Sequence, residues 1–435
     1  MGGSVQTIER NGADHSARLL PDPAPIVDFV LRQTLKYQSF MHLGAGVDRF
    51  RAAAGRGETT RVYFFGGSVA YNTGWQRFIK GDLIRAFPET KLEFVTSGVP
   101  SLDSTAQAFR VERDLLSRPP ADLVFLESAI DDDNNGRSTA DCIRGIEGCV
   151  RRLRRAWPDV DIVLLHFPSE RVVTTWSKET ERGAIVAHEA VAKHYGLPSL
   201  DMSAEFAGRI GRGEFSWKDY GGEEPATFGQ RLIWRSMQRL FSALHATEPL
   251  EGAPDAQPLP APMDVDSYAF GVQISPENAT LASGWILTPQ WIPNADEKGR
   301  DGFALRPTLE ARAEGAELEF AFSGRSIGIQ IVAGPDAGAL AWSVDGGQPQ
   351  TLGLHTAWSD RVHLPWFHVL ATGLEEGEHV LTLRSLAVDG RSAARIQAFL
   401  VDRGATFAGL PGDLTGALPP ILPPAPAAEQ DGKEK

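Results

Sequence analysis

RVYFFGGS, at residues 61–68, is an apolar run that ends in two glycines and a serine. Such a run, bounded by glycines, predicts a strand buried in the interior of a parallel sheet. At the carboxyl end of that strand, glycines permit a tight turn, and a helix that begins there presents free N–H groups. Ser68 stands at this point, where its hydroxyl would lie beside donors that stabilise an anion. A serine that only caps a helix would give the same local sequence.

Further apolar runs and amphipathic stretches alternate along the chain after Ser68. Amphipathic stretches have apolar residues at every third or fourth position and predict helices. The strands are expected at 91–98, 122–128, 161–168 and 197–202, and the helices at 75–87, 106–116, 143–157, 203–211 and 228–244. Strands that alternate with helices predict an α/β fold with a parallel sheet covered on both faces.

The hydrophobic pattern changes after a segment rich in proline, alanine and glycine, which predicts a linker at 246–264. Beyond it, apolar residues recur at every second position, as in ELEFAFSGRSIGIQIVAG (317–334), with turn signals about every eight to twelve residues. This pattern predicts an antiparallel β-sandwich or jelly roll over 265–403. The α/β domain is expected at 25–245. The polar segment 1–24 and the Pro-rich tail 404–435 are expected to lack structure.

Composition excludes several classes of protein. The chain has 435 residues, 42% hydrophobic and 23% charged, which is ordinary for folded proteins and large enough for two domains. Its formal net charge of -13 argues against a nucleic acid partner. No apolar run is long enough to span a membrane, and no signal peptide is recognised, so a cytoplasmic location is expected, although export is not excluded. The oligomeric state is not determined by the sequence.

No motif in the sequence predicts a cofactor or a metal. Cys142 and Cys149 lie seven positions apart in one predicted helix, too far for a disulfide, and are expected to be buried thiols. His188 and His194 lie six positions apart, whereas a zinc-protease helix needs a spacing of four, so they are expected to be partly exposed. The basic run RRLRR (151–155) ends a predicted helix and is expected to face solvent.

Three further segments place functional residue types at the ends of predicted elements. VTSGVPS follows the second strand and contains Gly98, and the third strand is followed by Ala129-Ile130-Asp131-Asp132. KDYGGEEPATFG (218–229), with Asp219 and Glu224, precedes the last helix. Together with FFGGS, these segments resemble the four blocks of the SGNH, or GDSL-type, hydrolase superfamily in order and spacing.

The resemblance implies a fold and a set of site residues. The superfamily contains esterases and acyl-group hydrolases on a flavodoxin-like three-layer α/β/α fold. It implies that Ser68 is the nucleophile and that the backbone N–H groups of Ser68 and Gly98 belong to the oxyanion hole. The β-rich second domain resembles one attached to a branch of SGNH proteins, where it is taken to assist carbohydrate recognition.

Two signature residues of the superfamily are replaced. Asp131 stands where the superfamily has an asparagine that donates to the oxyanion, and an ionised aspartate offers acceptors only. Glu224 stands where the superfamily has the general-base histidine. If Asp132 and Asp219 converge with these two near Ser68, like-charge repulsion would raise the pKa of Glu224 and make it a competent base. The alternatives are a histidine recruited from elsewhere and a site that has lost hydrolysis.

The sequence therefore leaves two functions open. The first is an SGNH-type serine esterase or acyl transferase with a non-standard base, acting on O-acylated carbohydrate. The second is a catalytically impaired relative that binds glycan, a cation or a partner in an acidic pocket. Such a pocket would suit a divalent metal, a basic substrate group or a carboxylate pair acting on glycosidic bonds.

The second domain carries two aromatic features that bear on these functions. Tryptophan faces commonly stack on sugar rings, but the same residues also serve as core. HLPWFHVL (363–370) combines two histidines, a proline and two aromatic residues, and is expected to dock on the first domain or to overhang the serine. The candidate tryptophans are Trp285, Trp291, Trp342, Trp358 and Trp366.

Overall fold

The computed structural model describes residues 6–7, 40–174, 183–222, 224–246, 259–294, 297–300 and 302–407. Most of the segment before residue 40, most of the predicted linker and the tail beyond residue 407 lie outside these residues. Within the described part, no helix is long and apolar enough to cross a membrane.

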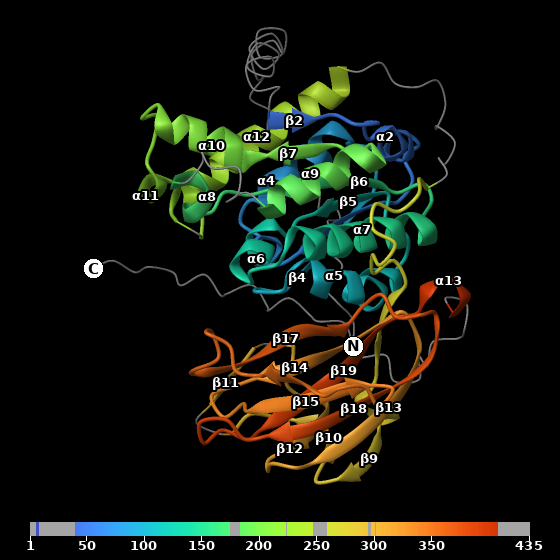
Figure 1. The fold of residues 1–435 in the computed structure, drawn as a ribbon. Coiled ribbons are helices and arrows are strands. Elements are labelled where there is room, and N and C mark those ends of the chain that lie inside the picture. The colour runs from blue at the N-terminus through green and yellow to red at the C-terminus, as the bar shows by residue number, and fades with distance from the viewer. Residues whose placement is uncertain are drawn as a thin grey trace.

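The first domain is built on one seven-stranded sheet, drawn in Figure 1, whose central strands are parallel. Every strand predicted from the apolar runs is present in it. Two residues of the N-terminal segment form β1, which pairs antiparallel with β4. The strand order is β1 (Gln6–Thr7), β4 (Leu92–Gly98), β3 (Thr60–Gly66), β5 (Leu123–Leu126), β6 (Asp161–His166), β7 (Ser199–Asp201) and β2 (Met41–His42).

Helices cover both faces of this sheet because both faces of its strands are apolar. In β3, Tyr63 and Phe65 point into one hydrophobic cluster, and Val62 and Phe64 point into the other. The first cluster lies under α5 (Ser104–Val111), α7 (Thr139–Ala156) and α9 (Gly183–Tyr195). The second lies under α2 (Asp48–Gly55), α4 (Gln76–Ala86), α10 (Met202–Gly211) and α12 (Thr227–Ala246).

Shorter elements complete the first domain and include those around Ser68. A π-helix at Glu112–Leu116 extends α5, which the sequence pattern does not distinguish from one continuous helix. The others are α3 (Ser68–Tyr71), α6 (Ala129–Asn134), α8 (Glu170–Thr174) and α11 (Trp217–Tyr220).

The second domain is rich in antiparallel strands, as the two-residue periodicity predicts. Its strands form two sheets with an apolar core between them, in which Phe320 stacks on Phe399. One sheet contains β10 (Ile286–Trp291), β12 (Arg306–Ala311), β19 (Ala394–Asp402), β14 (Ser326–Ala333), β17 (Val362–Ala371) and β11 (Lys298–Gly299), with β8 (Gly271–Ile274) on β19. The other contains β16 (Gln350–Gly353), β15 (Ala339–Val344), β18 (Gly377–Leu386), β13 (Glu317–Gly324) and β9 (Thr280–Ser283). The remaining elements are the 3-10 turn Pro276–Asn278 and α13 (Gly404–Phe407).

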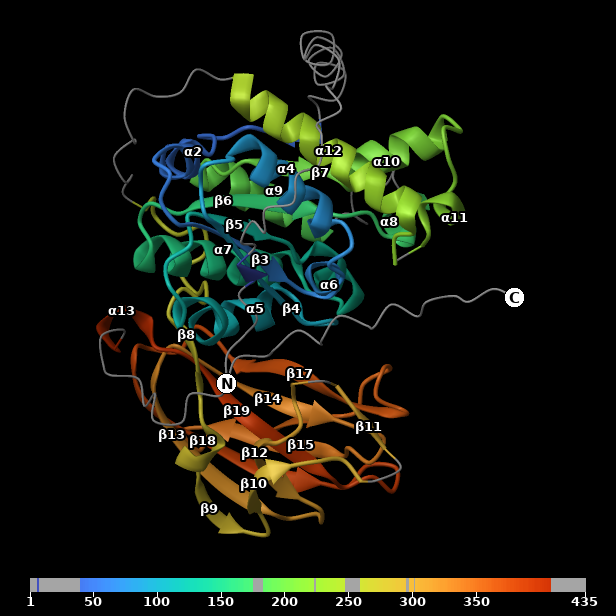
Figure 2. The ribbon, with the colours of Figure 1, turned by 180° about the vertical axis from the view of Figure 1, so that it is seen from behind.

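The two domains share a hydrophobic core around α5. All eight residues of this helix are buried, because the parallel sheet covers one side and the β17 sheet covers the other. Phe367 and Leu400 of the second domain belong to the same hydrophobic cluster as Phe109 of α5. Figures 1 and 2 show α5 and α6 facing the sheet that holds β14 and β17. The expectation that the 363–370 segment docks on the first domain is met through Phe367.

The basic run at 151–155 faces solvent only in part, because Arg151 is buried whereas Arg155 is exposed. Arg151 donates to the Pro260 carbonyl and Arg155 donates to the Ala269 carbonyl, so both bind the segment that leads into the second domain. The guanidinium of Arg155 also lies over the Phe270 ring. These arginines complete the domain interface. Cys142 and Cys149 are buried free thiols in α7, as expected.

Candidate active site

Ser68 is the first residue of α3 and follows β3 directly. Its Oγ donates a hydrogen bond to Asp131 Oδ1 at 2.7 Å, and its backbone N–H donates to Asp131 Oδ2 at 2.7 Å. Ser68 is partly exposed, whereas Asp131 is buried. The structure therefore brings together two of the site residues that the sequence singled out, and it places the carboxylate on the serine hydroxyl.

Gly66 and Gly67 make room for two carboxylates. A Cβ atom on Gly66 would lie 2.3 Å from Glu127 Oε1, and one on Gly67 would lie 1.9 Å from Asp131 Oδ2. Glu127 Oε1 accepts hydrogen bonds at 2.8 Å from the amides of Gly67 and Ala70. The glycine pair therefore has two roles: it allows the turn, and it leaves the space that the two carboxylates occupy next to the turn.

We expect Gly67→Ala to destabilise the protein by about 2 kcal/mol or more, since the new methyl group would displace a buried carboxylate. Gly81→Ala is the matched control. Gly81 lies inside α4, and the nearest atom to a Cβ there is on the Arg85 side chain at 3.5 Å. That substitution should stabilise the helix by about 0.5–1 kcal/mol. Urea unfolding of both variants measures the difference, and equal effects would contradict this account of Gly67.

Burial gives both carboxyl groups raised pKa values. Burial is the largest cause for Asp131 and raises its pKa to about 7, against the opposing hydrogen bonds from the Ser68 amide and hydroxyl. Burial and the Asp131 charge raise the pKa of Glu127 to about 8. Asp131 is thus a carboxylate basic enough to accept a serine proton near pH 7.

Ser101 supplies a second contact to the serine. Its backbone N–H donates to Ser68 Oγ at 3.1 Å. Gly98 ends β4 opposite Gly66 of β3, and a Cβ atom there would lie 2.2 Å from the Tyr71 amide nitrogen. Position 98 therefore needs a glycine because α3 crosses the end of β4 at close range.

Asp132 points away from the serine and into a separate polar cluster. It accepts hydrogen bonds from the amide and hydroxyl of Ser104, and His188 Nε2 lies 2.8 Å from its Oδ2 atom. His188 is buried, so the expectation that it is partly exposed is wrong, while His194 is exposed as expected. Among the described residues, no histidine contacts Ser68. An Asp–His pair is thus present next to the site, but it does not reach the nucleophile.

Asp219 and Glu224 make no contact with Ser68 in the described structure. Asp219 is exposed in α11, where it accepts hydrogen bonds from the Ser216 amide and hydroxyl, which hold its pKa below the ordinary value. This is a capping box at the start of a short helix. Glu224 is exposed in the loop between α11 and α12. Of the four carboxylates that the sequence suggested near Ser68, only Asp131 contacts it. Glu127, which the sequence did not suggest, contacts the same turn through backbone amides.

The described residues contain no group of three or more His, Cys, Asp or Glu side chains arranged to hold a metal ion. The cluster around Ser68 is engaged instead with backbone amides, the serine hydroxyl and His188. A cation in an acidic pocket, one of the alternatives left open by the sequence, gains no support from this arrangement.

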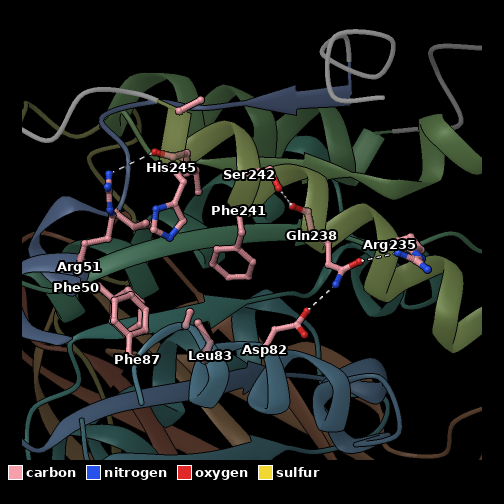
Figure 3. Close-up of a pocket in the computed structure, with 14 residues that line it drawn as sticks. Phe50, Arg51, Asp82, Leu83, Phe87, Arg235, Gln238, Phe241, Ser242 and His245 are labelled. Atoms are coloured by element: carbon pink, nitrogen blue, oxygen red, sulfur yellow. Dashed lines mark hydrogen bonds between the residues drawn. The ribbon is translucent and has the colours of Figure 1, made fainter. Parts of the chain in front are cut away.

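An apolar pocket of about 570 Å³ lies between α2, α4 and α12. Figure 3 shows Phe50, Phe87 and Phe241 around it, with Asp82 hydrogen-bonded to Gln238 at one side. It is formed at the carboxyl ends of α4 and α12. Ser68 lies at the opposite edge of the sheet, because these helices run antiparallel to the strands. The pocket is therefore separate from the serine site.

Fold and turn define a class of protein: an α/β domain that presents a serine hydroxyl at the carboxyl edge of its parallel sheet. Residues 52–248 match the model of the GDSL-like Lipase/Acylhydrolase family. The resemblance drawn from the four sequence blocks is confirmed at this level. No curated protein matches the chain.

Solved structures reproduce the two-domain architecture. The chain is similar to a two-domain esterase (CEX) active on acetylated mannans, with a TM-score of 0.70 and 18% identity over 84% of this chain and 98% of that chain. The structure of a CEX esterase co-crystallised with mannopentaose gives a TM-score of 0.65 at the same identity and coverage. At this identity the likeness establishes the fold, including the β-rich second domain.

Sequence reasoning missed four residues that shape the site, namely Glu127, Ser101, Asn135 and Arg137. A carboxylate that ends the apolar run DLVFLES was a signal for Glu127, since a buried acid needs partners. The other three lie in polar loops whose contacts depend on how α6 packs against the end of β4.

Proposed function

We propose that the protein is a serine esterase in which Ser68 attacks an acyl carbonyl and Asp131 accepts the serine proton. The observation that carries this proposal is the 2.7 Å hydrogen bond from Ser68 Oγ to Asp131 Oδ1. It joins a partly exposed nucleophile to a buried carboxylate whose pKa is raised to about 7. A base with a pKa near the working pH is the most effective proton acceptor. Glu224, the base suggested by the sequence pattern, makes no contact with Ser68.

Asp131 alone can accept and return the proton that each step of the reaction transfers. As Ser68 Oγ bonds to the carbonyl carbon, its proton passes to Asp131 Oδ1, and the carbonyl oxygen becomes an oxyanion. The protonated carboxyl then returns this proton to the leaving alcohol oxygen as the ester bond breaks. Water repeats the two steps on the acyl-serine, releasing the carboxylic acid and restoring Ser68.

The change of charge on Asp131 also bears on the oxyanion. In the resting site, Asp131 Oδ2 accepts a hydrogen bond from the Ser68 amide, which is one of the donors that the superfamily uses for the oxyanion. Proton transfer neutralises the carboxyl and weakens that hydrogen bond, so the amide is released as the oxyanion forms. A neutral carboxylic acid no longer repels the oxyanion and has a proton to donate. The substitution of asparagine by aspartate is compatible with catalysis on these terms.

We propose O-acetylated carbohydrate as the substrate class. The support is the fold that this chain shares with an esterase active on acetylated mannans, over both domains. The second domain offers one strongly exposed tryptophan of the five considered, Trp358 at 57%, whereas Trp285 and Trp291 are buried. An exposed indole in a loop is suited to stacking on a sugar ring.

The test is acetate release as a function of pH, measured on a small activated acetate ester and on acetylated manno-oligosaccharides. Because Asp131 must be ionised to accept the proton, the rate should rise about tenfold per pH unit below its pKa and level off above about pH 7. The small ester tests the chemistry, and a higher kcat/KM for the oligosaccharide tests the substrate class. A rate that stays constant between about pH 5 and about pH 8 would rule out Asp131 as the base.

A further inference from the structure

Ser101 holds a backbone conformation that side-chain-bearing residues rarely adopt. Its φ angle is +69°, in the left-handed region that favours glycine. Such a conformation persists only when surrounding contacts impose it, and it is often found where a site needs a group in a fixed place. The Ser101 N–H donates to Ser68 Oγ at 3.1 Å, and its carbonyl accepts a hydrogen bond from Asn135 Nδ2 at 3.0 Å.

A continuous chain of hydrogen bonds runs from this residue to the second domain. Asn135 Nδ2 also donates to Asp103 Oδ2 at 2.8 Å, and Arg137 Nε donates to the same oxygen at 2.7 Å. Arg137 Nη2 then donates to the Phe367 carbonyl of β17 at 3.1 Å. The side chain of Arg137 therefore binds both the loop beside the nucleophile and the main chain of the other domain.

The burial of Asp103 restricts which side chain can take the place of Arg137 in this series of hydrogen bonds. Asp103 is 2% exposed, and its other carboxylate oxygen caps α5 by accepting from the Ala106 amide. The Asp103 carboxylate raises the pKa of Arg137 above its ordinary value, so the guanidinium is charged at neutral pH. A planar guanidinium donates to Asp103 and to the carbonyl of Phe367 at once, from two different nitrogens. An ammonium group on a lysine side chain lacks that fixed fork.

We propose that Arg137 is a positioning residue through which the second domain fixes the Ser101 amide as a donor to the Ser68 oxygen. In this role the amide orients the Ser68 oxygen for attack while the hydroxyl proton points to Asp131 Oδ1. The catalytic part of this inference rests on the proposed esterase function, whereas the mechanical coupling between domain and loop does not.

The first test measures coupling without activity. Amide hydrogen exchange in the full-length chain is compared for wild type, Arg137→Gln and Arg144→Gln. Arg144 is the matched control, since it bonds Asp264 at 2.8 Å near the same interface but has no contact with the nucleophile loop. Exchange at residues 99–103 should be at least about tenfold faster in Arg137→Gln and unchanged in Arg144→Gln. Equal exchange in wild type and Arg137→Gln, or equal acceleration in both variants, overturns the coupling.

The second test measures its catalytic consequence with the same proteins. In Arg137→Gln, kcat should fall by about 10- to 100-fold while KM changes by less than about threefold, because the donor is misplaced but the substrate surface is intact. Arg137→Lys should recover only part of the loss, and it replaces Arg137→Gln if that variant does not fold. If wild type has no esterase activity, the esterase proposal fails and hydrogen exchange alone decides the coupling. Faster exchange with an unchanged kcat overturns the positioning role.

Discussion

Ser68→Ala is expected to abolish ester hydrolysis, with turnover falling by at least about 1,000-fold. The substitution removes the oxygen that attacks the acyl carbon, and the only groups left are donors and a carboxylate with no serine proton to accept. Acetate release from the activated ester, at about pH 8 where Asp131 is ionised, measures the loss.

Ser242→Ala is the control for this experiment. Ser242 also has a part-buried hydroxyl, which donates to the Gln238 carbonyl within α12 at 2.8 Å, at the edge of the sheet opposite Ser68. The control should keep wild-type turnover. If Ser68→Ala retained most of its activity, hydrolysis would have to come from another group or from a contaminant. Retained activity that is not due to a contaminant would contradict Ser68 as the nucleophile.

Asp131→Asn is expected to lower turnover by about 100- to 10,000-fold, the usual contribution of a general base. The asparagine oxygen can accept only one of the two hydrogen bonds that Ser68 donates to Asp131, and an amide takes no proton near neutral pH. The rise of rate with pH should also vanish, because Asp131 is the group whose ionisation controls it. Turnover measured as a function of pH in wild type and in Asp131→Asn tests both the loss of rate and the loss of pH dependence.

Asp161→Asn is the matched control for Asp131→Asn. Asp161 is another buried aspartate whose pKa is raised by burial, to about 6, and it accepts the Phe50 amide at 2.8 Å. It begins β6 at the amino edge of the sheet, so its amide variant should leave the pH profile intact. A gain of activity in Asp131→Asn would contradict the proposed base. It would mean that restoring the superfamily's asparagine restores an oxyanion hole that the aspartate blocks.

The fold was largely predictable because its deciding signals are local. The strands β3, β4, β5 and β6 are buried on both faces and are therefore continuous apolar runs in the sequence. Such strands can be predicted without knowing which elements pack against them. The switch to alternating residues, as in β13, equally marks the second domain. The run at 151–155 was only partly predictable because a helix sequence shows which residues are charged but not that Arg151 and Arg155 bind the segment leading into the second domain.

The site was predictable only in part. Ser68 and Asp131 follow strand ends and could be found from position, but the hydrogen bond between them depends on the orientation of α6. The role of the glycines as space for carboxylates follows from distances that no spacing rule contains. Ser101 has no sequence feature that predicts a left-handed backbone, since that conformation is imposed by Asn135 and Ser68.

The burial of α5 on all sides has a consequence for how this architecture can evolve. A helix that is buried toward both sheets, as Phe109 and its neighbours are, has no face left for water. The second domain therefore cannot be lost or exchanged by recombination at the linker without a rewritten α5. We therefore expect substitutions at this interface to be coupled between the two domains, so that the chain evolves as one unit rather than as an enzyme with a removable attachment.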